Sequence, residues 1–179
     1  MDVGCADDAD LSHHFLQQNG YVIYAVDPTK SHRSTLEELA RSNERFTYLP
    51  LALGAENTSL SFFHNTKFQS GSLFGRHINN SGNVEEYQVE CVDLKTLIDR
   101  MGHSEISYMK VDIEGAELEV FDAASDETIQ RVKQYYIEFH PHAFEDYDFD
   151  RLEAVKKKFK RLGYSRVSSD NVNILFYRS

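Results

Sequence analysis

Residues 108–117 read Tyr-Met-Lys-Val-Asp-Ile-Glu-Gly-Ala-Glu, and this stretch is more informative than any other in the chain. The apolar run before Asp112 is typical of a buried strand, and Gly115 begins a helical pattern. Side chains alternate along a strand, so Lys110, Asp112 and Glu114 are predicted to share one side. Charges at the carboxyl end of a parallel strand are typical of ligand sites in α/β sheets. Because unpaired buried charge is costly, the pattern favours a functional role.

Strand-like and helix-like segments alternate on both sides of this stretch. This order predicts an α/β fold with a mostly parallel central sheet and helices on both faces. A closing pair of strands predicts an antiparallel edge. The expected strands are 21–26, 46–53, 59–63, 86–92, 106–112, 134–140, 165–168 and 172–177, and the expected helices are 9–18, 31–42, 94–101, 116–124, 126–132 and 149–162.

The chain has 179 residues, enough for a single domain spanning residues 1–179. Its first strand looks truncated, because only Met1, Asp2 and Val3 precede the first loop. Residues 64–85 are rich in Ser, Gly and Asn. So long a loop in a compact domain is usually functional, which favours a substrate lid over an incidental surface loop.

Composition narrows the range of partners. The net charge of −10 disfavours nucleic acid and anionic membranes. No run approaches the roughly 18 apolar residues of a membrane span. Cys5 and Cys91 are too far apart in sequence for a CxxC metal site and form no disulfide framework, so we expect reduced thiols and a cytoplasmic protein. The oligomeric state stays open, with a dimer as one alternative.

The first loop, residues 2–7, reads Asp-Val-Gly-Cys-Ala-Asp. Its one glycine, Gly4, excludes a GxGxxG fingerprint, and the absence of GK[ST] excludes a P-loop. The loop is acidic, which suits a cationic ligand better than a pyrophosphate. Asp27 ends the second strand, where an acidic side chain can bind a ribose diol. An N-terminal helix cap is the alternative role of Asp27.

These segments occur together, in this order, in one known family. The chain resembles the FkbM-type S-adenosylmethionine-dependent methyltransferases over about residues 1–140. The most specific segment is 109–117. The others are Asp2-Val3-Gly4-Cys5-Ala6, Tyr24-Ala25-Val26-Asp27-Pro28, Leu51-Ala52-Leu53-Gly54, Val92-Asp93-Leu94 and Tyr136-Ile137-Glu138-Phe139-His140.

The resemblance implies a Rossmann-like class I methyltransferase fold with an antiparallel last strand. It also implies S-adenosylmethionine as the methyl donor, and O-methylation of a sugar or a glycan-like acceptor. Gly4, Cys5 and Ala6 would approach the methionine part, and Asp27 would hold the ribose. The expected cofactor-binding residues are Asp2, Gly4, Cys5, Ala6, Asp7, Asp27, Pro28, Ala52, Leu53 and Asp112.

A sugar hydroxyl is a poor nucleophile, with a pKa not far from that of water, about 15.7. Its activation needs a general base or a metal ion. We predict Asp112 as the base or metal ligand, with Lys110 and Glu138 also catalytic. Asp112, Glu138 and His140 could together bind Mg²⁺ or Mn²⁺. The alternatives are a hydrogen-bonded strand-end histidine at His140 and an ion pair between Glu138 and Lys110.

The acceptor is expected to be a small molecule or a glycan, contacted by Glu114, His140, Arg76 and His77. One alternative keeps the chemistry but changes the acceptor to a lipid, a peptide or another small molecule. Another is a degenerate cofactor-binding module without turnover. A nicotinamide oxidoreductase is disfavoured because the first loop lacks the required glycines.

Overall fold

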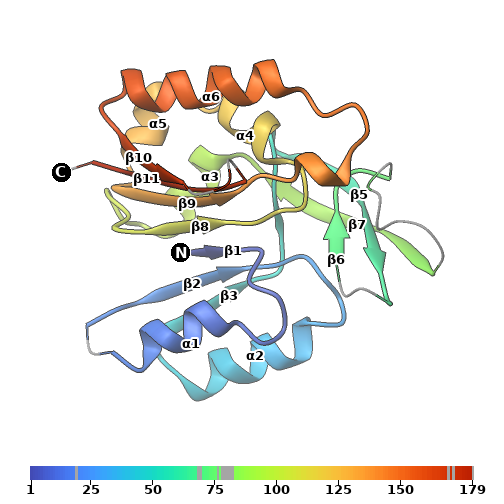
Figure 1. Ribbon diagram of the computed structural model, residues 1–179. Coiled ribbons are helices and arrows are strands. Elements are labelled where there is room, and N and C mark those ends of the chain that lie inside the picture. The colour runs from blue at the N-terminus through green and yellow to red at the C-terminus, as the bar shows by residue number, and fades with distance from the viewer. Residues whose placement is uncertain are drawn as a thin grey trace.

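The computed structural model describes residues 1–18, 20–67, 70–75, 77, 83–168, 170 and 172–178. Seven strands of this part form the main sheet, in the order β10-β11-β9-β8-β1-β2-β3 (Figure 1). The five strands from β9 to β3 in this order are parallel, whereas β11 is antiparallel to both β9 and β10. This confirms the predicted fold class. The strands are β1 (Asp2–Val3), β2 (Ile23–Val26), β3 (Phe46–Leu49), β8 (Met109–Val111), β9 (Gln134–Glu138), β10 (Ser165–Ser168) and β11 (Asn173–Tyr177).

The helices pack on this sheet through apolar faces. In Figure 1, α1 and α2 lie at the β2–β3 end, and α4, α5 and α6 lie toward the β9–β10 end. In α6, Leu152, Val155 and Phe159 are buried, as three- and four-residue spacing predicts for an amphipathic helix. The helices are α1 (Asp10–Leu16), α2 (Arg33–Ser42), α3 (Leu94–Arg100), α4 (Glu117–Ala123), α5 (Asp126–Gln130) and α6 (Phe149–Arg161).

The shortest strand lies near the centre of the sheet. β1 has two residues, yet it pairs with β2 on one side and β8 on the other. Asp2 lies opposite both Ala25 and Lys110 in the register. The first loop therefore leaves the sheet between the ends of β2 and β8, which places it beside Asp112.

The segment expected as one strand, 46–53, is divided at Pro50. Proline has no N–H to give to a ladder, so β3 ends at Leu49. The chain then enters a second sheet as β4 (Ala52–Leu53). This sheet has the order β4-β7-β5-β6, in which β5 is Thr58–Asn65, β6 is Ser70–Ser72 and β7 is Val84–Val92.

The second sheet contains part of residues 64–85, which were expected to form one long loop. Their two ends belong to β5 and β7, and β6 lies between them, so part of the expected loop is a strand. Figure 1 shows this sheet beside the main one. Leu53 and Val92 belong to the same buried cluster as Val3 and Val111, so the two sheets share a core. Among the described residues, no helix has the length and apolar character that crossing a membrane requires.

Candidate active site

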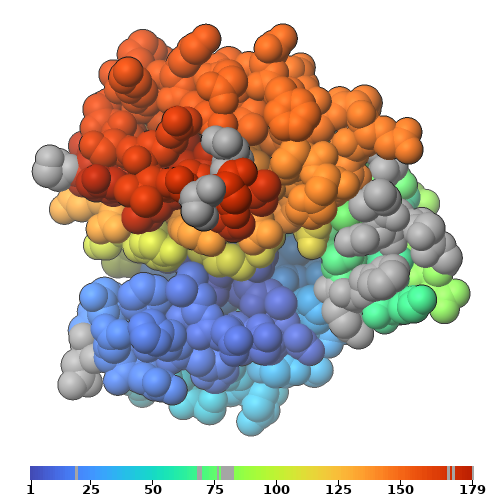
Figure 2. Space-filling view, in the orientation of Figure 1, coloured from blue at the N-terminus to red at the C-terminus, as the bar shows by residue number. Residues whose placement is uncertain are grey.

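A pocket lies where the carboxyl ends of β1, β2 and β8 face the second sheet. It encloses about 640 Å³, part of which is open to solvent. Figure 2 shows the surface hollowed between the blue N-terminal segments and the orange C-terminal ones, beside the green second sheet. The lining residues are Val3, Gly4, Ala6, Val26, Asp27, Pro28, Thr29, His32, Leu51, Ala52, Leu53, Phe62, Ser70, Gly71, Leu73, Asp112, Ile113 and Glu114.

The first loop forms one wall through its backbone. Gly4 has a φ of 76°, and its N–H donates to the carbonyl of Val26 at 2.8 Å. A Cβ at Gly4 would lie 1.7 Å from the carbonyl oxygen of Asp112, so no other residue fits without movement. Ala6 also has a positive φ, 55°, which turns its N–H toward Asp27. Local backbone strain is thus concentrated at the pocket.

The Asp27 carboxylate fixes this wall. One of its oxygens accepts the Ala6 N–H at 3.0 Å, and the other accepts the Thr29 N–H at 2.8 Å. His32 Nδ1 lies 3.4 Å from the same carboxylate. A carboxylate has about four lone-pair sites, so two remain for a ligand. The alternative role as a helix cap is wrong, because α2 begins after His32 and Asp27 instead organises the loop backbone. Asp27 lines the pocket, and its role as a ribose ligand stays a prediction.

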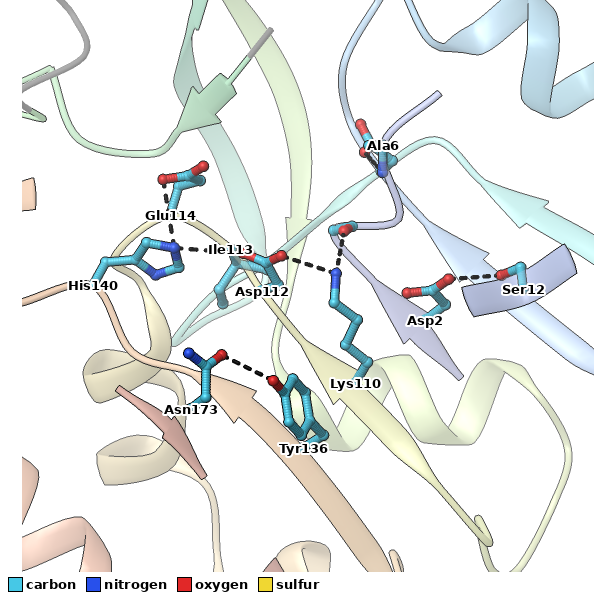
Figure 3. A network of polar contacts seen from close by, with 12 residues as sticks. Asp2, Ala6, Ser12, Lys110, Asp112, Ile113, Glu114, Tyr136, His140 and Asn173 are labelled. Atoms are coloured by element: carbon cyan, nitrogen blue, oxygen red, sulfur yellow. Dashed lines mark hydrogen bonds and ion pairs between the residues drawn. The ribbon is translucent and has the colours of Figure 1, made fainter. Parts of the chain in front are cut away.

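The opposite wall is built from charged side chains, which Figure 3 shows converging from neighbouring strands. Lys110 Nζ donates to Asp112 Oδ2 at 2.9 Å and to the Gly4 carbonyl at 3.2 Å. Burial acts to lower the pKa of Lys110, but the negative charge of Asp112 outweighs it, so the pKa is raised. Lys110 therefore stays charged and holds Asp112 against the first loop.

His140 lies two residues after the end of β9 and is 3% exposed. Its Nδ1 is 3.0 Å from Glu117 Oε1, and its Nε2 is 3.5 Å from Asp112 Oδ1 and 3.6 Å from Glu114 Oε2. Burial alone would lower the pKa of His140, but the hydrogen bond to Glu117 and the surrounding carboxylates raise it to about 9. The imidazole is therefore positively charged at neutral pH.

Glu114 enters this cluster through an unusual backbone conformation. Its φ is 53°, and Ser72 Oγ from β6 donates to its carbonyl at 2.7 Å. His77 Nε2 lies 2.9 Å from Glu114 Oε2. Burial would raise the pKa of Glu114, but His77 and His140 together lower it. Glu114 thus remains ionised between two histidines.

A comparison with known proteins identifies the family. A model of the methyltransferase FkbM domain matches residues 2–166. The chain belongs to the FkbM methyltransferase family. No curated protein sequence matches it.

Two solved structures support the class I methyltransferase fold. Methyltransferase FkbM from Methylobacillus flagellatus KT is 13% identical, with a TM-score of 0.55, over 99% of this chain and 42% of that one. A chain of a fibrillarin/Nop5p complex is 14% identical, with a TM-score of 0.55, over 99% of this chain and 71% of that one. This FkbM chain thus spans less than half of the Methylobacillus flagellatus protein. At such low identity, the likeness concerns the fold alone.

The pocket of this FkbM methyltransferase contains most, but not all, of the expected cofactor-binding residues. Asp2 is 2% exposed, accepts from Ser12 Oγ at 2.7 Å and is not one of the residues that line the pocket. Cys5 packs in an apolar cluster with Ala9 and Leu16, and burial raises the pKa of its thiol. Asp7 is exposed and faces α2. The residues that do line the pocket are Gly4, Ala6, Asp27, Pro28, Ala52, Leu53 and Asp112.

The expected catalytic and substrate residues also separate into groups. Lys110, Asp112 and His140 meet, as Figure 3 shows. Glu138 is the last residue of β9, two residues before His140. Among the described residues, its carboxylate has no hydrogen bond or ion pair. Lys110 is paired with Asp112 and not with Glu138. Burial and the charge of Asp112 raise the pKa of Glu138. Arg76 lies outside the described residues.

Sequence reasoning missed the importance of two buried side chains. Glu117 is 0% exposed, and its Oε1 accepts from the N–H groups of Ile113 and Gly115 as well as contacting His140. A carboxylate in the first turn of a helix is favoured by the helix dipole alone, so its place at the start of α4 does not by itself indicate this role. His32 is 3% exposed and lines the pocket. Neither residue carries a local sequence signal, because each acquires its contacts through the tertiary fold.

Proposed function

We propose that this FkbM methyltransferase is an S-adenosylmethionine-dependent O-methyltransferase that acts on a hydroxyl of a sugar or glycan-like acceptor. Family membership and fold support methyl transfer. The observation that carries the cofactor assignment is the shared pocket of Asp27 and Asp112. The proposal treats residues 1–179 as one methyltransferase domain, because both sheets contribute to one buried cluster.

The pocket residues fit S-adenosylmethionine by their chemistry. Asp27 offers carboxylate oxygens to a ribose diol. Ala52, Leu53 and Phe62 offer an apolar surface to a purine. Asp112 offers negative charge on the opposite wall. When bound, the cofactor supplies a methyl group on a positively charged sulfur, which an acidic wall would favour.

The acceptor hydroxyl must lose a proton, and the contacts of this site favour Glu138 as the group that takes it. Asp112, the first candidate from the sequence, is held by Lys110 at 2.9 Å. Glu138 is not paired with a cation among the described residues, and its raised pKa makes it a better proton acceptor near neutral pH. Lys110 and Asp112 then act by position and charge.

Several features support a hydroxylated acceptor over other classes. Carboxylates and histidines gather beside the pocket, which suits hydrogen bonding to a polyol. The net charge of −10 opposes an anionic surface as partner. His77 and Ser70, within the expected substrate loop 64–85, lie next to Glu114 and the pocket. A cytoplasmic location is part of the proposal, supported by two free, buried cysteines.

Calorimetry with S-adenosylmethionine tests the cofactor assignment. Asp27→Asn removes the charge and one of the two acceptor oxygens, so the affinity for S-adenosylmethionine should fall about 10-fold or more. Each factor of ten corresponds to about 1.4 kcal/mol of binding free energy. Asp7→Asn is the matched control, since Asp7 is exposed in the same loop and lies off the pocket. Its affinity should equal that of the unmodified protein. Absence of any binding by the unmodified protein would contradict the proposal.

The acceptor is tested with a methyl-labelled cofactor and a panel of sugars, phenols, lipids and peptides. We expect label to enter a sugar-containing acceptor as an alkali-stable methyl ether. Glu138→Gln should bind the cofactor normally and lose most of this transfer. Transfer only to a lipid or a peptide would refute the carbohydrate assignment while keeping methyltransferase activity.

A further inference from the structure

Three side chains direct one donor atom each toward a common point beside the pocket. They belong to Asp112, Glu114 and His140, and one ligand atom of each residue lies within 4.8 Å of the other two. His140 Nε2 is 3.5 Å from the aspartate oxygen and 3.6 Å from the glutamate oxygen. Two donors bound to one ion at about 2.1 Å can be at most about 4.2 Å apart, so both measured separations suit neighbouring ligands.

A fourth residue fixes the histidine in a ligand-like orientation. Glu117 Oε1 lies 3.0 Å from His140 Nδ1, and both side chains are buried. This contact places the proton on Nδ1 and aims Nε2 at the two carboxylates (Figure 3). Metal-binding histidines typically donate their other N–H to a carboxylate in this way. The Glu117 contact is independent of the convergence of Asp112 and Glu114.

The two carboxylates are also held by outer partners. Lys110 bonds to Asp112 Oδ2, which leaves Oδ1 directed inward. Glu114 is held by His77 at its side chain and by Ser72 at its carbonyl. Each candidate ligand therefore has a partner that fixes its position, which is typical of a built coordination site.

We propose that Asp112, Glu114 and His140 bind a divalent cation, with Glu117 positioning the histidine. Two oxygens and one imidazole nitrogen suit Mn²⁺ better than Mg²⁺, which prefers oxygen alone. Binding displaces a proton from Nε2 to solvent, while Nδ1 keeps its proton toward Glu117. This ligand set replaces the predicted Glu138 with Glu114.

The role of the cation rests on the proposed function, whereas its binding does not. Three protein ligands leave open positions on a six-coordinate ion, and acceptor oxygens could fill them. A bound hydroxyl becomes easier to deprotonate because the cation stabilises its anion. Glu114 and Asp112 also line the cofactor pocket, so such a hydroxyl would lie beside the methyl donor. An acceptor with two adjacent hydroxyls could coordinate through both of them.

Mn²⁺ titration, followed by electron paramagnetic resonance, tests the site on the full chain after chelator treatment and without cofactor. We expect one bound ion per chain. Glu114→Gln should weaken binding at least about tenfold, because it removes a direct ligand. Glu138→Gln removes the same charge from the adjacent strand face and should leave Mn²⁺ affinity unchanged. Glu114 is partly exposed, with 26% of its side chain accessible, so this variant is expected to fold.

A second measurement needs no variant. Electron spin-echo modulation of the bound Mn²⁺ should show a directly coordinated imidazole nitrogen, assigned by ¹⁵N-histidine labelling. Absence of stoichiometric binding, absence of the nitrogen signal, or loss of binding in Glu138→Gln but not Glu114→Gln would each overturn the inference. Mn²⁺ binding without S-adenosylmethionine binding would keep the metal site and contradict the proposed function, and the reverse result would do the opposite.

Discussion

The two walls of the pocket use different parts of the chain. On the first wall, Gly4, Ala6 and Thr29 contribute backbone groups: the Gly4 N–H donates to the Val26 carbonyl, and the Asp27 carboxylate accepts from the N–H groups of Ala6 and Thr29. On the second wall, Lys110 and the carboxylate–histidine cluster contribute charged side chains. The shape of the first wall is thus set by the backbone conformation, and that of the second wall by the attraction between oppositely charged side chains.

This difference has a functional consequence. A wall made of backbone can hold a constant ligand, because its shape depends little on the neighbouring side chains. A wall made of charged groups can polarise a reacting atom, because those groups are already oriented before the ligand arrives. We therefore propose that the first wall binds the cofactor, and that the second wall, which also faces the cofactor through Asp112, helps to activate the acceptor.

The prediction with the largest expected effect concerns the first wall. Gly4→Ala places a Cβ 1.7 Å from the Asp112 carbonyl oxygen at a φ of 76°, so the ends of β1 and β8 must separate. We expect a loss of about 4 kcal/mol or more in the free energy of unfolding, measured with urea. Gly102→Ala is the control, because Gly102 has a φ of 67° but no atom within 4 Å of the added Cβ. It should cost only about 1–2 kcal/mol.

Equal losses for the two glycines would contradict the close approach at Gly4. They would mean that the left-handed backbone, and not the contact between the two strand ends, makes glycine necessary. The first wall would then be less rigid than its geometry indicates.

The same contrast explains what the sequence could predict. The first wall follows from local signals, since Gly4 lies between a strand and a helix and Asp27 ends a β-rich run. Those signals placed both residues correctly at the strand ends. Cys5 and Asp7 share the loop with Gly4, but the turn directs one into the core and the other to solvent. Alternation does not apply within a turn, so their directions required the fold.

The second wall depends on contacts between distant segments. Lys110 and Asp112 were predictable as a pair, because they are two residues apart on one strand. Glu117 was not, since its burial depends on β9 bringing His140 over the start of α4. The break at Pro50 also sends the chain into the second sheet, which supplies Ser72 to the site. The hydrophobic periodicity and the secondary-structure propensities of a sequence carry no information on such contacts between distant segments.

The prediction with an intermediate expected effect concerns the second wall. Glu117→Gln keeps the size of the side chain but removes the buried charge that faces His140. Hydrogen bonds to charged groups contribute about 1.5–3 kcal/mol, so we expect the free energy of unfolding to fall by about 2 kcal/mol. Mn²⁺ affinity should also fall about 10–100-fold, as for other outer partners of a metal ligand.

Glu119→Gln is the control for this substitution. Glu119 lies in the same helix and pairs with Arg151 at 3.2 Å, with about a third of each side chain exposed. Partly exposed pairs contribute about 0.2–1 kcal/mol, and this one does not touch the cluster. A Glu117 variant that matched the Glu119 variant in both measurements would show that the buried charge does not position His140.

The prediction with the smallest expected effect concerns the support that the second sheet gives to the second wall. Ser72 is 1% exposed, and its Oγ donates to the Glu114 carbonyl at 2.7 Å while accepting from the Phe74 N–H at 3.1 Å. Ser72→Ala removes both contacts without leaving a large cavity, so we expect a loss of about 1 kcal/mol. Glu114 would also gain freedom, which should weaken Mn²⁺ binding a few-fold.

Ser61→Ala is the matched control, because Ser61 Oγ bonds to Glu86 at 2.7 Å and to Gln88 at 2.9 Å on the solvent side of the same sheet. Its loss should stay within about 0.5 kcal/mol and leave Mn²⁺ affinity unchanged. If Ser72→Ala lowered stability but not Mn²⁺ affinity, the second sheet would stabilise the fold without positioning Glu114. If both fell together, the left-handed conformation of Glu114 would depend on β6. The break at Pro50 that creates this sheet would then contribute directly to the site.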